Sequence, residues 1–236
     1  PYAELHCHSN FSFLDGASHP EELAEEAARL GLEALALTDH NGFYGVVRFS
    51  EAAKAIGLPT IFGAELTLLA PPGDLADRSA SSLTSADLSR PGPPDPHGQH
   101  LVILARDPQG YALLARAISE GQLAGEKGAP RIPYERLVEL GGTGSGDHWA
   151  VLTACRKGPV PAALVNEGPA AARRELERLV SDFGRSNVFV ELWDHGMPTD
   201  SVRNDGMAGL AVAAGVDIIA TANAHHHSVA RKRLAS

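Results

Sequence analysis

The chain is poor in cysteine and lacks long hydrophobic runs. Its 236 residues include two cysteines, Cys7 and Cys155, which are too few for a disulfide framework. We therefore expect a protein of a reducing compartment, the cytoplasm. No apolar run approaches the roughly 20 residues that a membrane-spanning helix needs, so we expect no membrane association.

Positive charge is also in short supply. Lys and Arg number 20 against 29 Asp and Glu, which gives a formal net charge of -9 with His counted as neutral. This balance argues against strong non-specific binding of duplex DNA by this segment alone. It does not argue against a metal site, because cations need anionic ligands. Hydrophobic residues make up 44% of the chain, which is enough for a globular domain with a sizeable core.

Short apolar segments alternate with helical patterns along almost the whole chain. The patterns predict strands at 3–8, 34–38, 60–69, 101–105, 149–154, 187–193 and 217–222. They predict helices at 20–30, 44–55, 109–119, 134–140, 160–166, 169–182 and 201–214. Alternation of this kind predicts an α/β fold with a mainly parallel sheet, and about seven strands are enough for a closed barrel.

One long stretch interrupts this rhythm. Residues 71–98 are rich in Pro, Ser, Asp and Gly and contain few large apolar side chains, which predicts a mobile insertion. The strand and helix pattern resumes after it, so we do not interpret it as a domain boundary. The chain begins at Pro1 without a Met and ends at Ser236 soon after a helix-like start. We therefore expect it to be a piece of a longer protein.

Side chains that bind metals gather at the ends of the predicted strands. In parallel α/β folds the carboxyl ends of the strands share one rim, where active sites lie. Residues two apart on a strand face the same side, so the imidazoles of a His-x-His pair can converge on one ion. The candidates at these ends are His6, His8, His40, Glu65, Cys155 and His225, whereas His100 precedes the fourth strand. Each alone could be a buried structural residue; their joint placement favours a metal site.

Several short motifs resemble one known family. His6-Cys7-His8-Ser9 with Asp15-Gly16, then Leu37-Thr38-Asp39-His40, then Gly63-Ala64-Glu65, resemble the polymerase and histidinol phosphatase (PHP) superfamily. The segments around His100, around Cys155 and at 189–192 are similar to the PHP domain of bacterial DnaE-type DNA polymerases, and the resemblance runs nearly end to end. The tail 220–225 with 230–235 looks most like the error-prone, damage-inducible branch.

The resemblance implies a distorted (β/α)7 barrel with a metal site at the carboxyl-end rim of its strands. It implies two or three divalent metals, Zn or Mn and in some members Mg or Fe. Carried over to this sequence, the first ion would be bound by His6, His8 and Glu65, and the second by Glu65, His100 and Cys155. The third would be bound by Asp15, His40 and His225.

One position departs from the family pattern. The ninth ligand of the family is usually Asp, and it falls on Asn223 here. An Asn keeps an oxygen ligand but removes a full negative charge beside the first ion. We therefore expect weaker binding of that ion, and a loss of charge that puts catalysis in question.

Other polar residues have supporting roles in this interpretation. Asp39 precedes His40, and a carboxylate beside a metal-binding His often orients an imidazole. Arg106, Arg156 and Lys157 follow predicted strands, where they either contact phosphates or lie in solvated loops. Glu191 and His195 face either the rim or the solvent.

The resemblance implies a function for the longer protein to which this chain would belong, and it leaves two possible functions open for the domain itself. The parent would be a DNA polymerase of translesion synthesis and damage-induced mutagenesis, which contacts DNA and other replication or mutagenesis proteins. Residues 1–228 would form the PHP domain, and 229–236 would begin the connection to the polymerase domains. The domain itself is either a metal-dependent phosphoesterase, a 3′–5′ exonuclease, or a non-catalytic metal-binding module that stabilises the polymerase. A free-standing histidinol phosphatase fits the polymerase-like segments less well.

Overall fold

The computed structural model describes residues 1–13, 15–69, 98–126 and 128–234. The predicted insertion at 71–98 lies, except for Gly98, outside these residues. Seven strands occur in the part of the chain that the structure describes. They are β1 (Ala3–Glu4), β2 (Ala34–Leu37), β3 (Thr60–Leu68), β4 (Gln99–Ala105), β5 (Trp149–Leu152), β6 (Val188–Leu192) and β7 (Asp217–Ala220).

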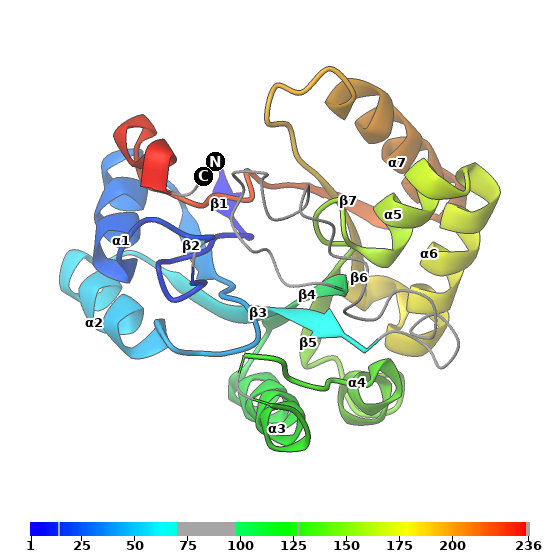
Figure 1. Cartoon of the computed structure of the whole chain (residues 1–236), viewed down its shortest axis with the longest axis horizontal. Coiled ribbons are helices and arrows are strands. Elements are labelled where there is room, and N and C mark those ends of the chain that lie inside the picture. The colour runs from blue at the N-terminus through cyan, green and yellow to red at the C-terminus, as the bar shows by residue number, and fades with distance from the viewer. Residues whose placement is uncertain (14, 70–97, 127, 235–236) are drawn as a thin grey trace, which may run out of the picture.

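Helices cover the outside of the strands (Figure 1). They are α1 (Pro20–Arg29), α2 (Val46–Ile56), α3 (Pro108–Ala124), α4 (Tyr134–Gly141), α5 (Pro159–Asn166), α6 (Pro169–Phe183) and α7 (Asp200–Ala214), with the 3₁₀ helices η1 (Arg185–Asn187) and η2 (Val229–Leu234). Local sequence explains their ends. Asp107 caps α3 by accepting a hydrogen bond from the amide of Gly110, and α2 ends at Gly57 with φ +71°. None of the described helices is long and apolar enough to cross a lipid bilayer.

The seven strands form one sheet in the order of the sequence, from β1 to β7. The predicted α/β architecture is confirmed, but the sheet is mixed. Four neighbouring pairs are parallel, whereas β4 runs antiparallel to both β3 and β5. The expectation of a mainly parallel sheet did not foresee this reversal, because periodicity in a sequence carries no information on strand direction.

The two ends of the sheet approach each other beyond β1 and β7. Cys7 and Ala224 form a parallel bridge there, in which the amide of His8 donates to the carbonyl of Ala224 over 2.8 Å. The carboxylate of Glu4 accepts a hydrogen bond from the amide of Ala222 over 2.8 Å. The sheet is therefore curled almost into a barrel, and it is joined at the end where the site lies.

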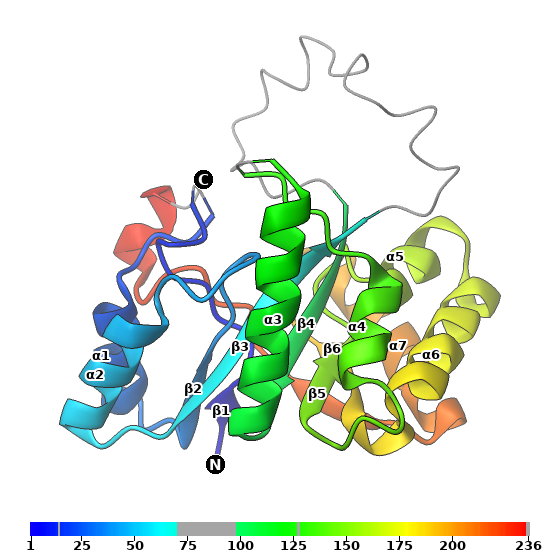
Figure 2. The ribbon, with the colours of Figure 1, turned by 90° about the horizontal axis from the view of Figure 1, so that it is seen from below.

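The packing of the core decides which side chains face the interior of the sheet. Cys7 is 1% exposed and packs with Leu37 and Phe49 beneath α1 and α2. Because successive side chains of an extended segment alternate, the neighbours of Cys7 point the opposite way, into the interior. The larger core lies between the strands and α3–α7, and Trp149 and Phe183 are buried in it. Figure 2 shows α3 and α4 along the outside of the central strands.

Candidate metal centre

The predicted ligands converge at one end of the sheet. His6 and His8 lie on the extension of β1, His40 follows β2, and Glu65 lies within β3. Glu65 forms a parallel bridge with His40, which places the two at the same rim. The others arrive from the loop before α1, from the start of β4, and from the segments after β5 and β7: Asp15, His100, Cys155 and His225.

His100 shows why the reversed strand matters. It lies near the amino end of β4, opposite Thr67 of β3. In a parallel β4 this end would lie at the far side of the sheet. Because β4 is antiparallel, its amino end joins the carboxyl ends of its neighbours, and the fully buried His100 reaches the cluster.

The carboxylate of Glu65 lies at the centre of the cluster. It is 2% exposed, and both of its oxygens have nitrogen or sulfur neighbours. Its Oε2 lies 3.0 Å from Nε2 of His8, 3.3 Å from Nε2 of His6 and 3.7 Å from Nδ1 of His40. Its Oε1 lies 3.0 Å from Nδ1 of His100 and 3.4 Å from Sγ of Cys155. One carboxylate thus faces donor atoms of five other candidates, as a bridging ligand would.

Hydrogen bonds behind the two first histidines set their tautomers. Nδ1 of His6 lies 2.7 Å from Oε1 of Glu191, and a carboxylate only accepts, so this nitrogen carries a proton. Ser12 donates its hydroxyl proton to Asp39 over 2.7 Å and therefore accepts from Nδ1 of His8 over 3.0 Å. The Nε2 atoms of both rings thus face Glu65, and they are 3.1 Å apart.

The electrostatics of this group match a cation site. Burial lowers the pKa of His6, but the charges of Glu191 and Glu65 outweigh burial and raise that pKa well above its usual value. Burial and the charge of His40 lower the pKa of His8 to about 3. Burial raises the pKa of Glu65, yet its imidazole partners hold it well below the usual range. The Nε2 atoms of His6 and His8 and the ionised carboxylate of Glu65 lie close enough together to bind one cation. This set of nitrogen and oxygen donors fits Zn²⁺ or Mn²⁺.

A second carboxylate organises the other half of the cluster. Oδ2 of Asp15 lies 3.2 Å from Nε2 of His40 and 3.0 Å from Nδ1 of His225. Burial raises the pKa of Asp15, but hydrogen bonding to His225 and His40 lowers it further than burial raises it. Asp15 is therefore ionised at neutral pH and can act as an anionic ligand.

Three groups of residues have ligand atoms that all lie within 4.8 Å of one another. The first, His6, His8 and Glu65, coincides with the predicted first ion. The other two are His8, Asp15 and His40, and His40, Glu65 and His100. They share members with the predicted second and third ions. Cys155 and His225 belong to none of the three groups, although each touches a carboxylate of the cluster.

Asn223 lies beside the first group. It precedes Ala224, whose amide donates to the carbonyl of His6 over 2.9 Å. Asn223 is 8% exposed, and its Oδ1 has no hydrogen-bond partner among the described residues. A buried amide oxygen without a donor is costly, and a cation would satisfy it. The position of Asn223 therefore fits a ligand, but a neutral one.

Backbone strain is concentrated at this rim. In the described part of the chain, three non-glycine residues have positive φ angles: Asn41 at 52°, Ala154 at 63° and Asn223 at 44°. Asn41 directly follows His40, Ala154 directly precedes Cys155, and Asn223 lies two residues before His225. Asn adopts such angles readily, whereas at Ala154 the angle costs about 1–2 kcal/mol and persists because the surrounding structure fixes it.

Two buried carboxylates support the candidate ligands from behind. Asp39 accepts hydrogen bonds from the amide and hydroxyl of Ser9, both over 2.8 Å, and from Ser12. It therefore acts on His8 through Ser12 and touches no imidazole in the described hydrogen bonds. Glu191 touches His6 directly, a role that the sequence left open. A charged residue within the otherwise apolar β6 was the signal that could have identified it.

The three basic residues singled out in the sequence, Arg106, Arg156 and Lys157, do not lie together in the structure. Arg106 follows β4, and because β4 is reversed it lies at the end of the sheet away from the cluster. Its guanidinium donates to the carbonyls of Trp149 and Ser186 over 3.1 and 2.9 Å. The structure thus removes Arg106 from the predicted phosphate contacts of the metal site. Arg156 and Lys157 directly follow Cys155, and Arg156 is exposed.

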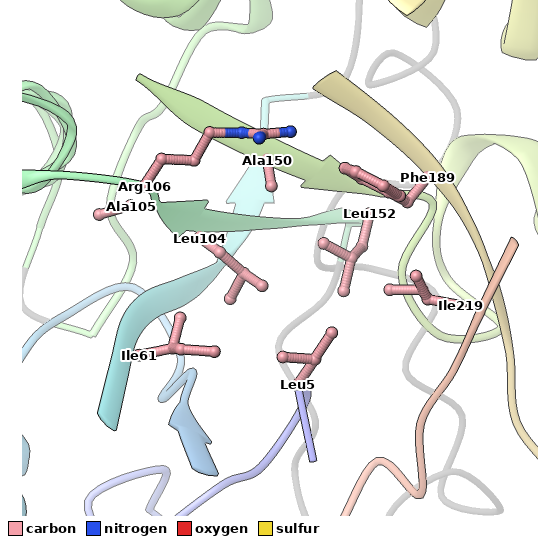
Figure 3. Close-up of a pocket in the computed structure, with 9 residues that line it drawn as sticks. All are labelled: Leu5, Ile61, Leu104, Ala105, Arg106, Ala150, Leu152, Phe189 and Ile219. Carbon is pink, nitrogen blue, oxygen red and sulfur yellow. The ribbon is translucent and has the colours of Figure 1, made fainter. Parts of the chain in front are cut away.

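Arg106 borders an apolar cavity of about 390 Å³ inside the sheet (Figure 3). No His or carboxylate lines this cavity. Its lining comprises Leu5, Ile61, Leu104, Ala105, Arg106, Ala150, Leu152, Phe189 and Ile219. This cavity therefore lies at the end of the sheet away from the metal cluster.

The PHP domain family matches residues 4–195 of this chain. The chain belongs to the PHP family. The match includes six of the candidate ligands and Cys155, and it ends before Asn223 and His225.

Error-prone DNA polymerases are similar to the chain over its whole length. Those of Mycolicibacterium paratuberculosis and Mycobacterium tuberculosis are 51% and 52% identical over 236 and 235 residues, and that of Nocardia farcinica is 45% identical over 261 aligned residues. These matches cover 99–100% of this chain and 20–22% of each polymerase. The chain thus spans about a fifth of the length of these relatives.

Two solved structures have folds similar to that of this chain at low sequence identity. One is a proposed metal-dependent phosphoesterase of Bifidobacterium adolescentis, with a TM-score of 0.59 and 14% identity, covering 94% of this chain and 87% of that one. The other is an amidohydrolase of Chromobacterium violaceum with bound sulfate and no metal, with a TM-score of 0.55 and 18% identity, covering 96% and 88%. At these identities the likeness concerns the fold alone.

Proposed function

We propose that this PHP domain is a polynuclear metal-dependent phosphoesterase that removes nucleotides from the 3′ end of DNA. The observation that carries the proposal is the convergence of Nε2 of His6 and Nε2 of His8 on the carboxylate of Glu65, at 3.3 and 3.0 Å. The hydrogen bonds behind both rings point these nitrogens inward. Two or three divalent ions, Zn²⁺ or Mn²⁺ with Mg²⁺ and Fe²⁺ as alternatives, are the cofactors.

The chain contributes ligands and the residues that hold them in place. The ligands would be His6, His8, Asp15, His40, Glu65, His100, Cys155, Asn223 and His225. Bound ions would supply activation of water and neutralisation of the charge that develops on the phosphoryl oxygens. Glu191 fixes the ring of His6, and Ser12 fixes that of His8. Arg156 and Lys157, beside Cys155, would contact the phosphates of the substrate strand.

Metal content and strand degradation test this proposal together. Purified protein, reconstituted with Zn²⁺ and Mn²⁺, is expected to hold more than one ion per chain by elemental analysis. With Mn²⁺ it should shorten a 5′-labelled single strand from its 3′ end, and His8→Ala should abolish the shortening. His148→Ala, at the opposite end of the sheet, is the matched control. Absence of bound metal, or equal activity in His8→Ala, would refute the proposal.

The second candidate function is a non-catalytic metal-binding module that stabilises the polymerase and its partner contacts. Asn223 favours it, because a neutral amide stands where the family usually has Asp. In that case reconstituted protein would bind metal and gain thermal stability, yet leave the labelled strand intact. Restored degradation by Asn223→Asp would then assign the missing activity to the missing charge.

The similarity to error-prone DNA polymerases supports a proposal for the whole protein. We propose that the domain belongs to a cytoplasmic error-prone DNA polymerase acting in translesion synthesis and damage-induced mutagenesis. Contact with DNA would then occur mainly through the rest of the polymerase, in keeping with the net charge of -9 on this segment. Other replication or mutagenesis proteins would be its partners.

A further inference from the structure

An exposed aromatic ring lies at the edge of the metal centre. Phe13 is 80% exposed, which makes it the most exposed aromatic side chain in the part of the chain that the structure describes. Its neighbour Ser12 is 1% exposed and contacts His8, and Asp15 is 6% exposed and contacts His40 and His225. Phe13 thus lies in a turn both of whose ends touch the cluster.

The residues on either side of this turn are joined by hydrogen bonds. The amides of Asp15 and Gly16 both donate to the carbonyl of Ser12, over 3.0 and 2.9 Å. A Cβ at Gly16 would lie 1.9 Å from the carbonyl oxygen of Ser9, so only glycine allows the close approach found there. The backbone at Ser12, Asp15 and Gly16 is therefore held in place, and the side chain of Phe13 is exposed to solvent.

Phe13 is unusual at such a place. Tight turns ordinarily carry Gly, Pro, Asn, Asp or Ser, and a phenyl ring in water gains nothing for folding. The amide of Ala17, just beyond the turn, donates to the carbonyl of His225 over 2.8 Å, which ties the turn to the segment after β7. The ring is thus displayed from a scaffold shared with the candidate ligands.

We propose that Phe13 stacks on the base of the nucleotide whose phosphodiester meets the metal cluster. Every nucleobase offers a π-face, so stacking on a ring gives affinity for single strands without sequence preference. A ring fixed at the rim holds the terminal base while the phosphate lies over the cluster. Arg156, exposed directly after Cys155, supplies positive charge for the strand. The proposal rests on the phosphoesterase function and specifies nucleotide ends as its substrate.

The test measures binding, so that it does not depend on catalysis. One single-stranded oligonucleotide carries 2-aminopurine as its 3′-terminal base, and a second ends in an abasic residue. Both have a phosphorothioate at the last linkage to prevent cleavage, and Mn²⁺ is present. The wild-type chain is expected to quench the 2-aminopurine and to bind the base-ended strand more tightly than the abasic one.

Phe13→Ala should lose the quenching and weaken binding of the base-ended strand by about 5- to 150-fold, with the abasic strand unaffected. Phe13→Trp should retain both effects, since its ring also stacks. Val212→Ala, which changes a 78% exposed side chain on α7, is the control and should match wild type. Circular dichroism establishes that each variant is folded.

Two results would overturn the inference: the same preference for a base in Phe13→Ala as in wild type, or no binding of either strand by wild type. Its failure is distinguishable from that of the proposed function. A base preference that depends on Phe13, without cleavage of an ordinary strand, leaves the stacking role standing and refutes the exonuclease. Cleavage of an ordinary strand without that base preference supports the exonuclease and refutes the stacking role of Phe13.

Discussion

Nδ1 of His6 lies 2.7 Å from Oε1 of Glu191, and both side chains are fully buried. The same carboxylate oxygen accepts the hydroxyl of Thr221 over 2.6 Å. These bonds hold Glu191 and, through it, the ring of His6. The orientation of His6 is therefore determined from β6, on the side of the ring away from Glu65.

Glu191→Gln tests this relationship, because it removes the charge and keeps the shape. We expect metal affinity to fall about 10- to 100-fold, the usual effect of losing a carboxylate behind a metal-binding imidazole. Isothermal titration with Zn²⁺ measures it. Glu33→Gln, at an exposed position, is the control. Equal affinity in Glu191→Gln and wild type would show that Glu191 is merely structural.

Asn223→Asp restores the charge that the family usually has. A carboxylate offsets the repulsion between neighbouring dications, so we expect more metal per chain and tighter binding. Elemental analysis after dialysis against a weak chelator gives the count. Asn166→Asp makes the same change at an exposed residue and should have no effect. An unchanged count in Asn223→Asp would contradict the charge argument.

Ser12 joins the two halves of the site. Its hydroxyl accepts from Nδ1 of His8 and from the amide of His40, and it donates to Asp39. Ser12→Ala leaves these buried groups without a partner, so we expect a loss of about 1–3 kcal/mol in the free energy of unfolding. Urea denaturation measures the loss in the metal-free protein.

The exposed Ser119→Ala serves as the comparison for Ser12→Ala and should change stability by less than about 0.5 kcal/mol. A loss equally small in Ser12→Ala would mean that water replaces the hydroxyl. The proposed support of His8 would then be wrong.

Asp200 predicts a pH dependence of stability away from the metal site. Burial raises its pKa, but the amides of His195 and Met197 and the guanidinium of Arg203 lower it further, to about 2. Its folded pKa lies below the unfolded value of about 3.9. The stabilisation is therefore present above about pH 4 and is lost as the pH falls towards 2.

Asp200→Asn should accordingly be less stable than wild type at pH 6, and the difference should shrink as the pH falls from 4 to 2. Thermal unfolding across this range, with Asp205→Asn as the control, measures the difference. A difference that is independent of pH would show that the Asp200 carboxylate does not titrate as described.

The sequence predicted most of the elements to within a few residues, because apolar periodicity and glycine or proline boundaries are local signals. The strand direction of β4 was not predictable in this way, since reversal depends on how the chain crosses between β3 and β4. The consequence was uneven. His100, at the start of β4, lies at the rim, whereas Arg106, just past the end of β4, lies at the opposite end of the sheet, which excludes the phosphate contact that the sequence left open for it.

The strand lengths show a second limit. The first strand was expected to reach His8, but the regular pairing of β1 stops at Glu4 and resumes only as the bridge of Cys7 with Ala224. The third strand, predicted at 60–69, is found at Thr60–Leu68, so Glu65 reaches the rim from within a strand and not from its end. Propensity cannot foresee pairing interrupted to admit side chains from several strands. The contact of Glu191 with His6 spans 185 residues and leaves no local signal.

The three positive φ angles beside His40, Cys155 and His225 have a consequence for the whole domain. The angle at Ala154 in particular lowers the free energy of unfolding at the edge where ions would bind, so the alignment of the ligands there reduces the stability of the domain. Ions that bind only the folded rim would stabilise it and offset the free-energy cost of its backbone conformation. Metal binding and folding are therefore linked. Chelation should then loosen this rim before the sheet beneath it, with faster amide exchange at Asn41, Ala154 and Asn223 than in β4.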